Sequence, residues 1–167
     1  MSQVFSEINK VVNVLDFMSH ADSSGPTSDI VNMESYKKCT FILATGASAA
    51  NTPVLRVLAG TSSTSAATAI AYKYRTQIGA IPPATASDVP SALTDIASSG
   101  FAITTGKAGG VYIIEVDAAT VAAAGTAYDH VCLDVSSGAA HAAHIYGVLA
   151  VLSEPRYPQG ILVTAID

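Results

Sequence analysis

The histidines toward the C-terminal end of the chain are the residues whose types and spacing come nearest to a metal site. His141 and His144 form an HxxH pair, and His130 and Asp134 precede it by a few positions. Imidazole nitrogens and carboxylate oxygens are ordinary zinc ligands. Residues three apart on a strand point to opposite faces, so the pair would bind one ion only if residues 140–143 form a turn. The spacing favours surface or loop histidines, and we expect no metal.

Two further patterns approach catalytic or phosphate-binding motifs without matching them. Residues 106–110 read Gly-Lys-Ala-Gly-Gly, but the lysine precedes the glycine pair and no strand-to-helix context follows, which favours a hairpin turn. Residues 46–50 come nearest to a nucleophile elbow and lack its second glycine. No close pair of acidic residues lies in an apolar setting suited to acid–base catalysis. We therefore predict a protein that is not an enzyme and binds no cofactor.

The two cysteines, Cys39 and Cys132, lie far apart in the sequence, each within an apolar segment. Their separation differs from the close spacing of a zinc knuckle or a redox CxxC pair. The pattern predicts two buried free thiols. A disulfide formed after release from the cell is the alternative.

The composition excludes several kinds of partner. The chain has 167 residues, of which 13% are charged, and its net charge is -5 with only eight Lys and Arg. A surface that binds phosphates needs clustered Lys and Arg, so we expect no nucleic acid and no anionic membrane as partner. The longest apolar run, residues 145–152, is shorter than the roughly 20 residues that span a bilayer. The first residues show no export-signal pattern, and we expect a soluble protein made inside a cell.

Strand patterns dominate the body of the chain. Apolar and polar residues alternate over 70–75 and 111–117, which is typical of strands with one buried face. The alternation over 130–135 predicts a further strand. Shorter strand patterns cover 39–44 and 54–58. Residues 143–152 are almost continuously apolar, which predicts a strand buried on both faces.

The remaining segments predict few helices. Residues 4–20 fit both a helix and an extended arm, and a polar loop over 20–29 follows them. A short helix is expected over 118–124, with the Asp117 carboxylate capping its first turn and Gly125 ending it. The segment 79–100 contains several prolines and predicts a long loop with at most a short helix over 91–98.

These elements predict a mainly β fold. We expect an antiparallel β-sandwich or barrel with an extended N-terminal arm and one or two short helices. Residues 1–28 would form the arm and its loop, and residues 29–167 a single β-rich domain. Because charge is so sparse, much of the exterior must be Ala, Ser, Thr and Gly, whereas a freely diffusing enzyme usually carries more charge. The composition therefore favours a protein that works inside an assembly.

Several short segments resemble small virion proteins of tailed bacteriophages. These segments are Lys-Val-Val-Asn at 10–13, Asp-Ile-Val-Asn-Met-Glu-Ser-Tyr at 29–36, Lys-Cys-Thr-Phe-Ile-Leu at 38–43, Ile-Glu-Val-Asp-Ala-Ala at 114–119 and Leu-Ser-Glu-Pro-Arg-Tyr at 152–157. The middle of the chain, 60–100, shows no matching pattern. The resemblance implies a capsid decoration, or cement, protein: a β-rich subunit, typically trimeric, that clamps adjoining major capsid proteins.

The expected partners are therefore the major capsid protein and the chain itself, as a homotrimer on the capsid surface after synthesis in the host cytoplasm. The candidate contact residues in the N-terminal segment are Val4, Phe5, Ile8, Val11, Val12, Leu15 and Phe17. Tyr36, Arg156 and Tyr157 complete the set, since Arg and Tyr are frequent in subunit interfaces. The alternative for the last two is an arginine that pairs a carboxylate at a strand end beside a partly buried tyrosine.

Two other functions remain open at this point. A tail-tube, tail-terminator or head-fibre subunit would also tolerate a β-rich sequence with little charge. A small carbohydrate-binding or hydrolytic β-sandwich module belongs to another class, and the absence of Trp counts against an aromatic sugar platform.

Overall fold

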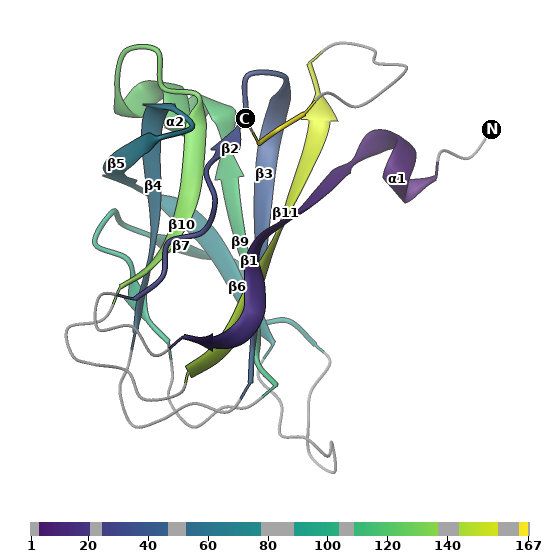
Figure 1. Ribbon diagram of the computed structural model, residues 1–167, viewed down its shortest axis with the longest axis vertical. Coiled ribbons are helices and arrows are strands. Elements are labelled where there is room, and N and C mark those ends of the chain that lie inside the picture. Colours follow the sequence, from purple (N-terminus) through teal and green to yellow (C-terminus); the bar gives the residue numbers. More distant parts are fainter. Residues whose placement is uncertain are drawn as a thin grey trace.

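The alternating apolar segments form two antiparallel sheets that pack face to face as a sandwich (Figure 1). The computed structural model describes residues 4–20, 25–46, 53–77, 89–103, 109–136, 144–156 and 164–166. The mainly β prediction is confirmed. Of the two predicted architectures the sandwich is correct, because the sheets do not close into a barrel.

The larger sheet has six strands in the order β1, β11, β3, β9, β6, β7. Their bounds are β1 Lys10–His20, β11 His144–Pro155, β3 Tyr36–Thr45, β9 Val111–Asp117, β6 Tyr72–Gln77 and β7 Thr94–Ile96. Strand β11 pairs with β1 on one side and with β3 on the other. The first and last long strands of the chain are therefore neighbours in one sheet.

The smaller sheet has five strands, with β2, β10, β4 and β5 in order and β8 paired to β4. Their bounds are β2 Val31–Asn32, β10 His130–Ser136, β4 Val54–Ser62, β5 Ser65–Ile70 and β8 Phe101–Ala102. Two helices, α1 Phe5–Ile8 and α2 Ala118–Ala124, lie outside the sheets. Within the described residues no helix has the length and apolarity needed to cross a membrane.

The core lies between the inward faces of the two sheets. In β9 the side chains of Tyr112, Ile114 and Val116 are buried, whereas Glu115 and Asp117 are exposed. This is the alternation predicted for residues 111–117. Period-two alternation is thus the signal that places one face of β9 in the core.

An aromatic cluster joins the sheets at one end of the core. Phe101 stacks on Tyr74 with ring centroids 4.1 Å apart, and Tyr72 and Tyr112 lie at tilted angles to the same ring. The hydroxyl of Tyr72 donates a buried 2.7 Å hydrogen bond to the carbonyl of Leu55. Since Tyr72 belongs to β6 and Leu55 to β4, this bond connects one sheet to the other.

The alternating segment 70–75 crosses between the sheets. Ile70 ends β5 in the smaller sheet, and Tyr72 begins β6 in the larger one. Both side chains are buried, so the alternation is preserved across Ala71 although one predicted strand is in fact two.

Strand β10 is buried on both faces. Every residue from His130 to Val135 is buried, including Cys132, as predicted for its thiol, and Asp134. The Asp134 carboxylate accepts bonds from the Arg56 guanidinium at 2.8 and 3.1 Å and from the Thr27 hydroxyl at 3.3 Å. These partners allow a carboxylate to be buried within the strand.

The prediction that β11 is buried on both faces is wrong. Tyr146, Val148, Ala150 and Leu152 face the core and are buried, but Leu149 on the opposite face is 42% exposed. Among the described residues nothing covers this outer face completely. The continuous apolar run therefore marks a strand with one apolar face left at the surface.

No helix forms over residues 91–98. Strand β7 lies there instead, paired with β6 through Tyr72–Ile96, Lys73–Asp95 and Tyr74–Thr94. Residues 78–88 of the predicted loop lie outside the described residues. A strand this short exists only through its partner, which local composition does not reveal.

Helix α2 has the predicted bounds, but its predicted cap is wrong. Asp117 occupies the N-cap position with extended backbone angles, yet its carboxylate makes no capping hydrogen bond. Gly125 is the C-cap, where a Cβ would come within 2.8 Å of the Tyr128 ring. Packing of Ala118 and Val121 into the core therefore holds the helix.

The N-terminal segment is mostly part of the sandwich. From Lys10 to His20 the predicted arm is β1, an edge strand hydrogen-bonded to β11. The amide of Asp29 also donates a 2.8 Å bond to the carbonyl of Val14, which is buried. Within the described part of this segment, only residues 4–9, which include α1, stand off the body (Figure 1).

We predict that Tyr72→Phe lowers the free energy of unfolding by about 1 kcal/mol, because it removes the buried bond to Leu55 and keeps the ring. Urea or guanidinium unfolding measures this change. Tyr74→Phe is the matched control, since the Tyr74 hydroxyl makes no hydrogen bond to a described residue. Equal losses for both variants would contradict the assignment.

We predict that both thiols stay unmodified by an aromatic disulfide reagent in the native protein at neutral pH. Cys39 and Cys132 are free and buried, and burial raises the pKa of Cys132 to about 12 and that of Cys39 likewise upward. The reactive thiolate is therefore scarce. In denaturant without reductant both should react. Fast native modification would contradict burial, and absence of reaction in denaturant would indicate the disulfide alternative.

Candidate functional site

The N-terminal tip, defined as Val4, Phe5 and Ile8, presents large apolar side chains to solvent. Their exposed fractions are 59%, 58% and 37%, and no residue of α1 is buried. A single helical turn costs conformational entropy to form, so local hydrogen bonds are needed to stabilise it. The Val4 amide donates to the Glu7 carboxylate at 3.0 Å, and the Asn9 amide and side chain both donate to the Phe5 carbonyl. The tip is thus an ordered turn with its apolar groups outward.

A second exposed apolar area covers the outer faces of β1 and β11. We define this outer apolar face by Val11, Phe17 and Leu149, whose exposed fractions are 47%, 60% and 42%. The register places Val11 beside Val151 and Asn13 beside Leu149. Leu149 points away from the core, because Val148 and Ala150 on either side of it are buried, and Val11 pairs with Val151 on the same face.

Gly147 allows β1 to lie closely over this face. A Cβ at position 147 would come within 2.8 Å of the Cα and Cβ of Phe17. The β1–β11 register shifts between Leu15 and Met18, next to this contact. The bulged strand therefore carries Phe17 across the glycine and leaves its ring exposed.

The other predicted contact residues differ in how far they are buried. Val12 and Leu15 are partly buried and pack against the core. Tyr36 is fully buried, and its amide donates to the carbonyl of Met33. It offers no surface to another subunit, so its assignment as a contact is wrong. Its position at the inward-facing start of β3 is the reason. Tyr157 lies outside the described residues.

Leu149 is an exposed residue that sequence reasoning missed. Its strand is apolar on both faces, and such a run does not tell an open face from a covered one. Met18, which is 55% exposed, was missed because the helical and extended patterns both fit its segment.

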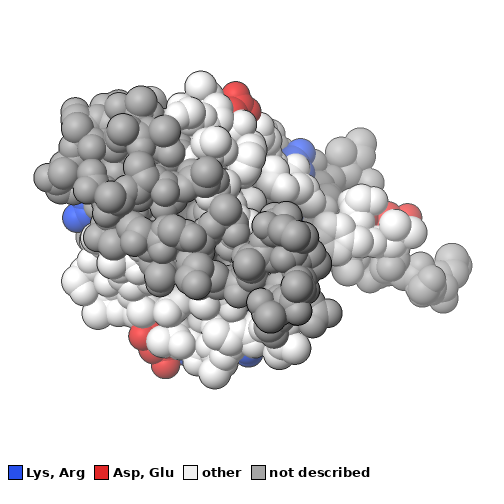
Figure 2. Space-filling model, turned by 90° about the horizontal axis from the view of Figure 1, so that it is seen from below, with Lys and Arg blue, Asp and Glu red and all other residues white. Residues whose placement is uncertain are grey.

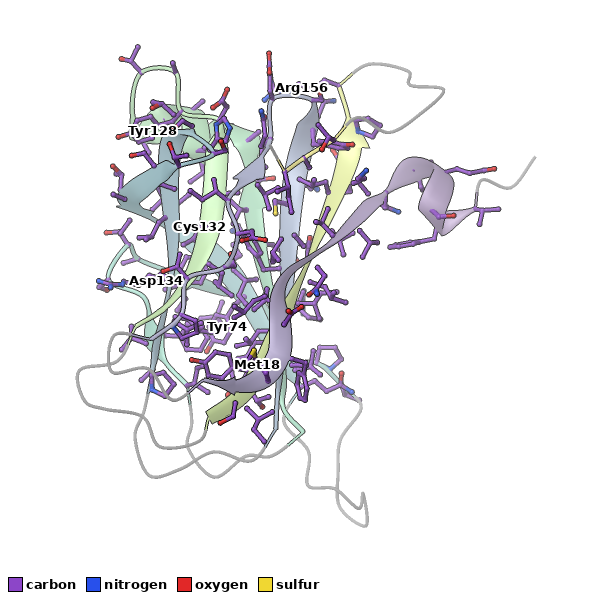
Figure 3. The ribbon with its side chains drawn as sticks, in the orientation of Figure 1. Met18, Tyr74, Tyr128, Cys132, Asp134 and Arg156 are labelled. Carbon is purple, nitrogen blue, oxygen red and sulfur yellow. The ribbon has the colours of Figure 1, made fainter. Side chains whose placement is uncertain are left out.

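A basic groove lies where β3, β11 and α2 meet. We define it by Lys37, Lys38, Arg156 and the alanines of α2 at 118, 119 and 122, and it encloses about 610 Å³. Arg156 lies at the upper end of the sandwich in Figure 3. Its Nε donates to the Tyr36 carbonyl at 3.4 Å, and it forms no ion pair with a described residue. The predicted pairing of Arg156 with a carboxylate is thus not found in the described part of the chain.

The groove also contains an exposed ion pair. Lys38 Nζ lies 2.9 Å from Glu154 Oε1, and both side chains are 50% exposed. The bond raises the pKa of Lys38 and lowers that of Glu154. Solvent screens such a pair, so it contributes little to stability. Asp117, on the rim, is the other acidic residue that lines the groove.

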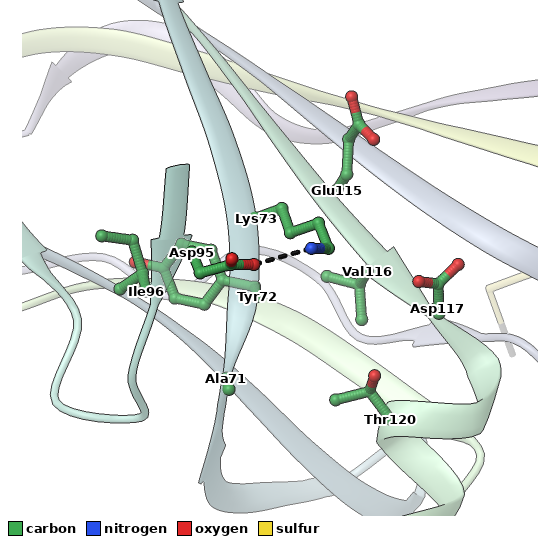
Figure 4. A pocket seen from close by; sticks show the side chains of 9 residues that line it. All are labelled: Ala71, Tyr72, Lys73, Asp95, Ile96, Glu115, Val116, Asp117 and Thr120. Carbon is green, nitrogen blue, oxygen red and sulfur yellow. Dashed lines mark hydrogen bonds and ion pairs between the residues drawn. The ribbon is translucent and has the colours of Figure 1, made fainter. Parts of the chain in front are cut away.

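A smaller pocket near the start of α2 does not have the size of a substrate site. Figure 4 shows Lys73 bonded to Asp95, with Glu115 and Asp117 on the neighbouring strand. The pocket encloses about 140 Å³, whereas small-molecule sites usually reach at least ~300 Å³. Room for a few waters is all that it offers.

Of the candidate metal-binding histidines, His130 is the one whose side chain the structure describes. His130 is buried, and its Nδ1 lies against the Asp129 carboxylate. His144 begins β11, and His141 lies outside the described residues. The described part of the chain holds no cluster of three potential metal ligands. Residues 46–50 and 106–110 are likewise only partly described, and their predicted conformations stay predictions.

Comparison of the chain with protein-family models, with curated proteins and with solved structures gave no match. What the structure itself offers on function is therefore the geometry and chemistry of its surface.

Proposed function

We propose that the protein is a structural subunit of a bacteriophage virion that decorates the capsid and bridges adjacent major capsid proteins without catalysis. The observation that carries the proposal is the large apolar surface left open by an ordered sandwich. The N-terminal tip and the outer apolar face expose apolar side chains. In a protein with so little charge, covering these side chains with a partner is favourable in free energy. The resemblance to virion proteins of tailed phages supports the choice of a phage virion as the assembly.

Bridging requires more than one contact surface. The outer apolar face lies on β1 and β11, and the basic groove lies at the ends of β3 and β11 beside α2. A subunit with two such areas adds buried contact area between its neighbours. On a pressurised shell this added area resists separation of the capsid subunits.

The sparse charge supports the same role. In the view of Figure 2, the described Lys, Arg, Asp and Glu occupy small separate areas. Long charged side chains lose conformational entropy when an interface orders them, and small uncharged residues lose little. We propose the major capsid protein and further copies of this chain, as a homotrimer, for the partners.

The proposal is tested by locating the chain in purified virions. We expect the polypeptide in washed particles, with labelled antibody on the head in electron micrographs. Label on the tail or on head fibres would replace the proposal with another virion position. Absence from virions together with glycan binding or hydrolysis would support the β-sandwich module instead.

We predict that Phe17→Ser weakens binding of the purified chain to particles that lack it, raising Kd by about tenfold. Phe17 offers its ring at the outer apolar face, and serine removes that contact area. Co-sedimentation over a concentration series measures the affinity. Leu93→Ser is the matched control, because Leu93 is 41% exposed outside this face. Equal effects of the two variants would contradict the assigned face.

A further inference from the structure

We infer that the N-terminal tip of one copy docks into the basic groove of a second copy. The inference rests on the self-association included in the proposed function and names the two surfaces that meet. Each chain carries one tip and one groove, so the contact joins different patches of two copies. Such contacts close into a ring when the rotation permits, and a trimer is one such ring.

The described part of the chain does not bury the apolar side chains of the tip. None of the residues of α1 is buried, and Figure 1 shows the helix standing off both sheets. Local hydrogen bonds nevertheless order the turn, so little conformational entropy is left to lose on docking. An ordered apolar projection of this kind fits a cavity on another molecule.

The groove has room for large side chains because its wall on α2 is made of small ones. Ala119 and Ala122 are exposed, and Thr120 is the largest residue that α2 contributes to the groove. A phenylalanine and an isoleucine from the tip can lie over these alanines without displacing a larger side chain. The contact would combine apolar packing with charge around it.

The charges of the two surfaces are complementary. Between Val4 and Asn9 the only charged residue is Glu7, which gives the tip one negative charge. The groove holds three of the chain's eight Lys and Arg against the carboxylates of Asp117 and Glu154. Lys38 is paired with Glu154, whereas Lys37 forms no ion pair with a described residue. The Glu7 carboxylate uses one oxygen for the Val4 amide and has capacity for a cation.

A charge swap tests the docking. We expect Lys37→Glu to weaken self-association by about tenfold, since an attraction becomes a repulsion. Lys37→Glu with Glu7→Lys should recover part of it, because the charges again attract although the Val4 amide loses its acceptor. Sedimentation velocity over a concentration series measures the affinity, and added salt should reduce the difference between variants. Lys73→Glu is the matched control, because Lys73 is an exposed cation outside the groove.

Glu7 also closes the helical turn, so a second variant separates loss of charge from loss of the turn. Glu7→Gln keeps an oxygen for the Val4 amide and removes the charge. We expect it to weaken association less than Lys37→Glu does, and Phe5→Ala to weaken it at least as much. Unchanged association in Lys37→Glu and Phe5→Ala would overturn the inference.

Photo-cross-linking decides which chain receives the tip. A photoreactive phenylalanine analogue replaces Phe5 in an isotope-labelled chain, which is mixed with unlabelled chain. Cross-links from the labelled tip to unlabelled peptides containing Lys37, Lys38 or residues 118–124 would support docking between copies. Cross-links confined to one chain would overturn it. A chain that is monomeric yet present on the capsid would overturn this inference and the homotrimer, but would leave the capsid-decorating role standing. Tip-dependent association without virion incorporation would reject only that role.

Discussion

The packing of two sheets through their inward faces is the constraint on which the rest of the structure depends. Because side chains alternate along a strand, a slip of one residue in β11 would move Val148 out of the core and Leu149 into it. The pairs that β11 makes with β1 and β3 therefore have a register set by burial. The bond from Tyr72 to Leu55 holds the sheets together where the aromatic rings meet.

The same constraint produces the exposed surface. Strand β11 is apolar on both faces, but the sandwich uses only one of them, so Leu149 remains at the surface, as does Val11 on the adjacent strand β1. Exposed apolar area costs free energy that a partner recovers by covering it. At the ends of β3 and β11, Lys37 and Arg156 meet the alanines of α2 and add a charged surface to the apolar one. Both surfaces suit a protein that stays bound to neighbours.

Much of the fold and part of the candidate site could be predicted. Alternation over 111–117 identified β9 because one face of that strand is buried and the other is exposed to solvent. The exposed contact candidates were found on the N-terminal segment, with Phe5 and Phe17 the largest. Tyr36 was misassigned because an apolar ring at a strand start looks the same whether it faces the core or a partner. Strand β7 was missed because three residues acquire strand structure only by pairing with β6.

The sequence by itself determined the β class, the position of most strands, the bounds of α2 and the burial of both thiols. These properties follow from local period and composition, which act over a few residues. Only the tertiary structure decided which faces of β10 and β11 are covered, which sheet each strand joins, and that Lys37 and Arg156 share a groove. Those features depend on contacts between residues far apart in the chain, and a local sequence pattern does not specify such contacts.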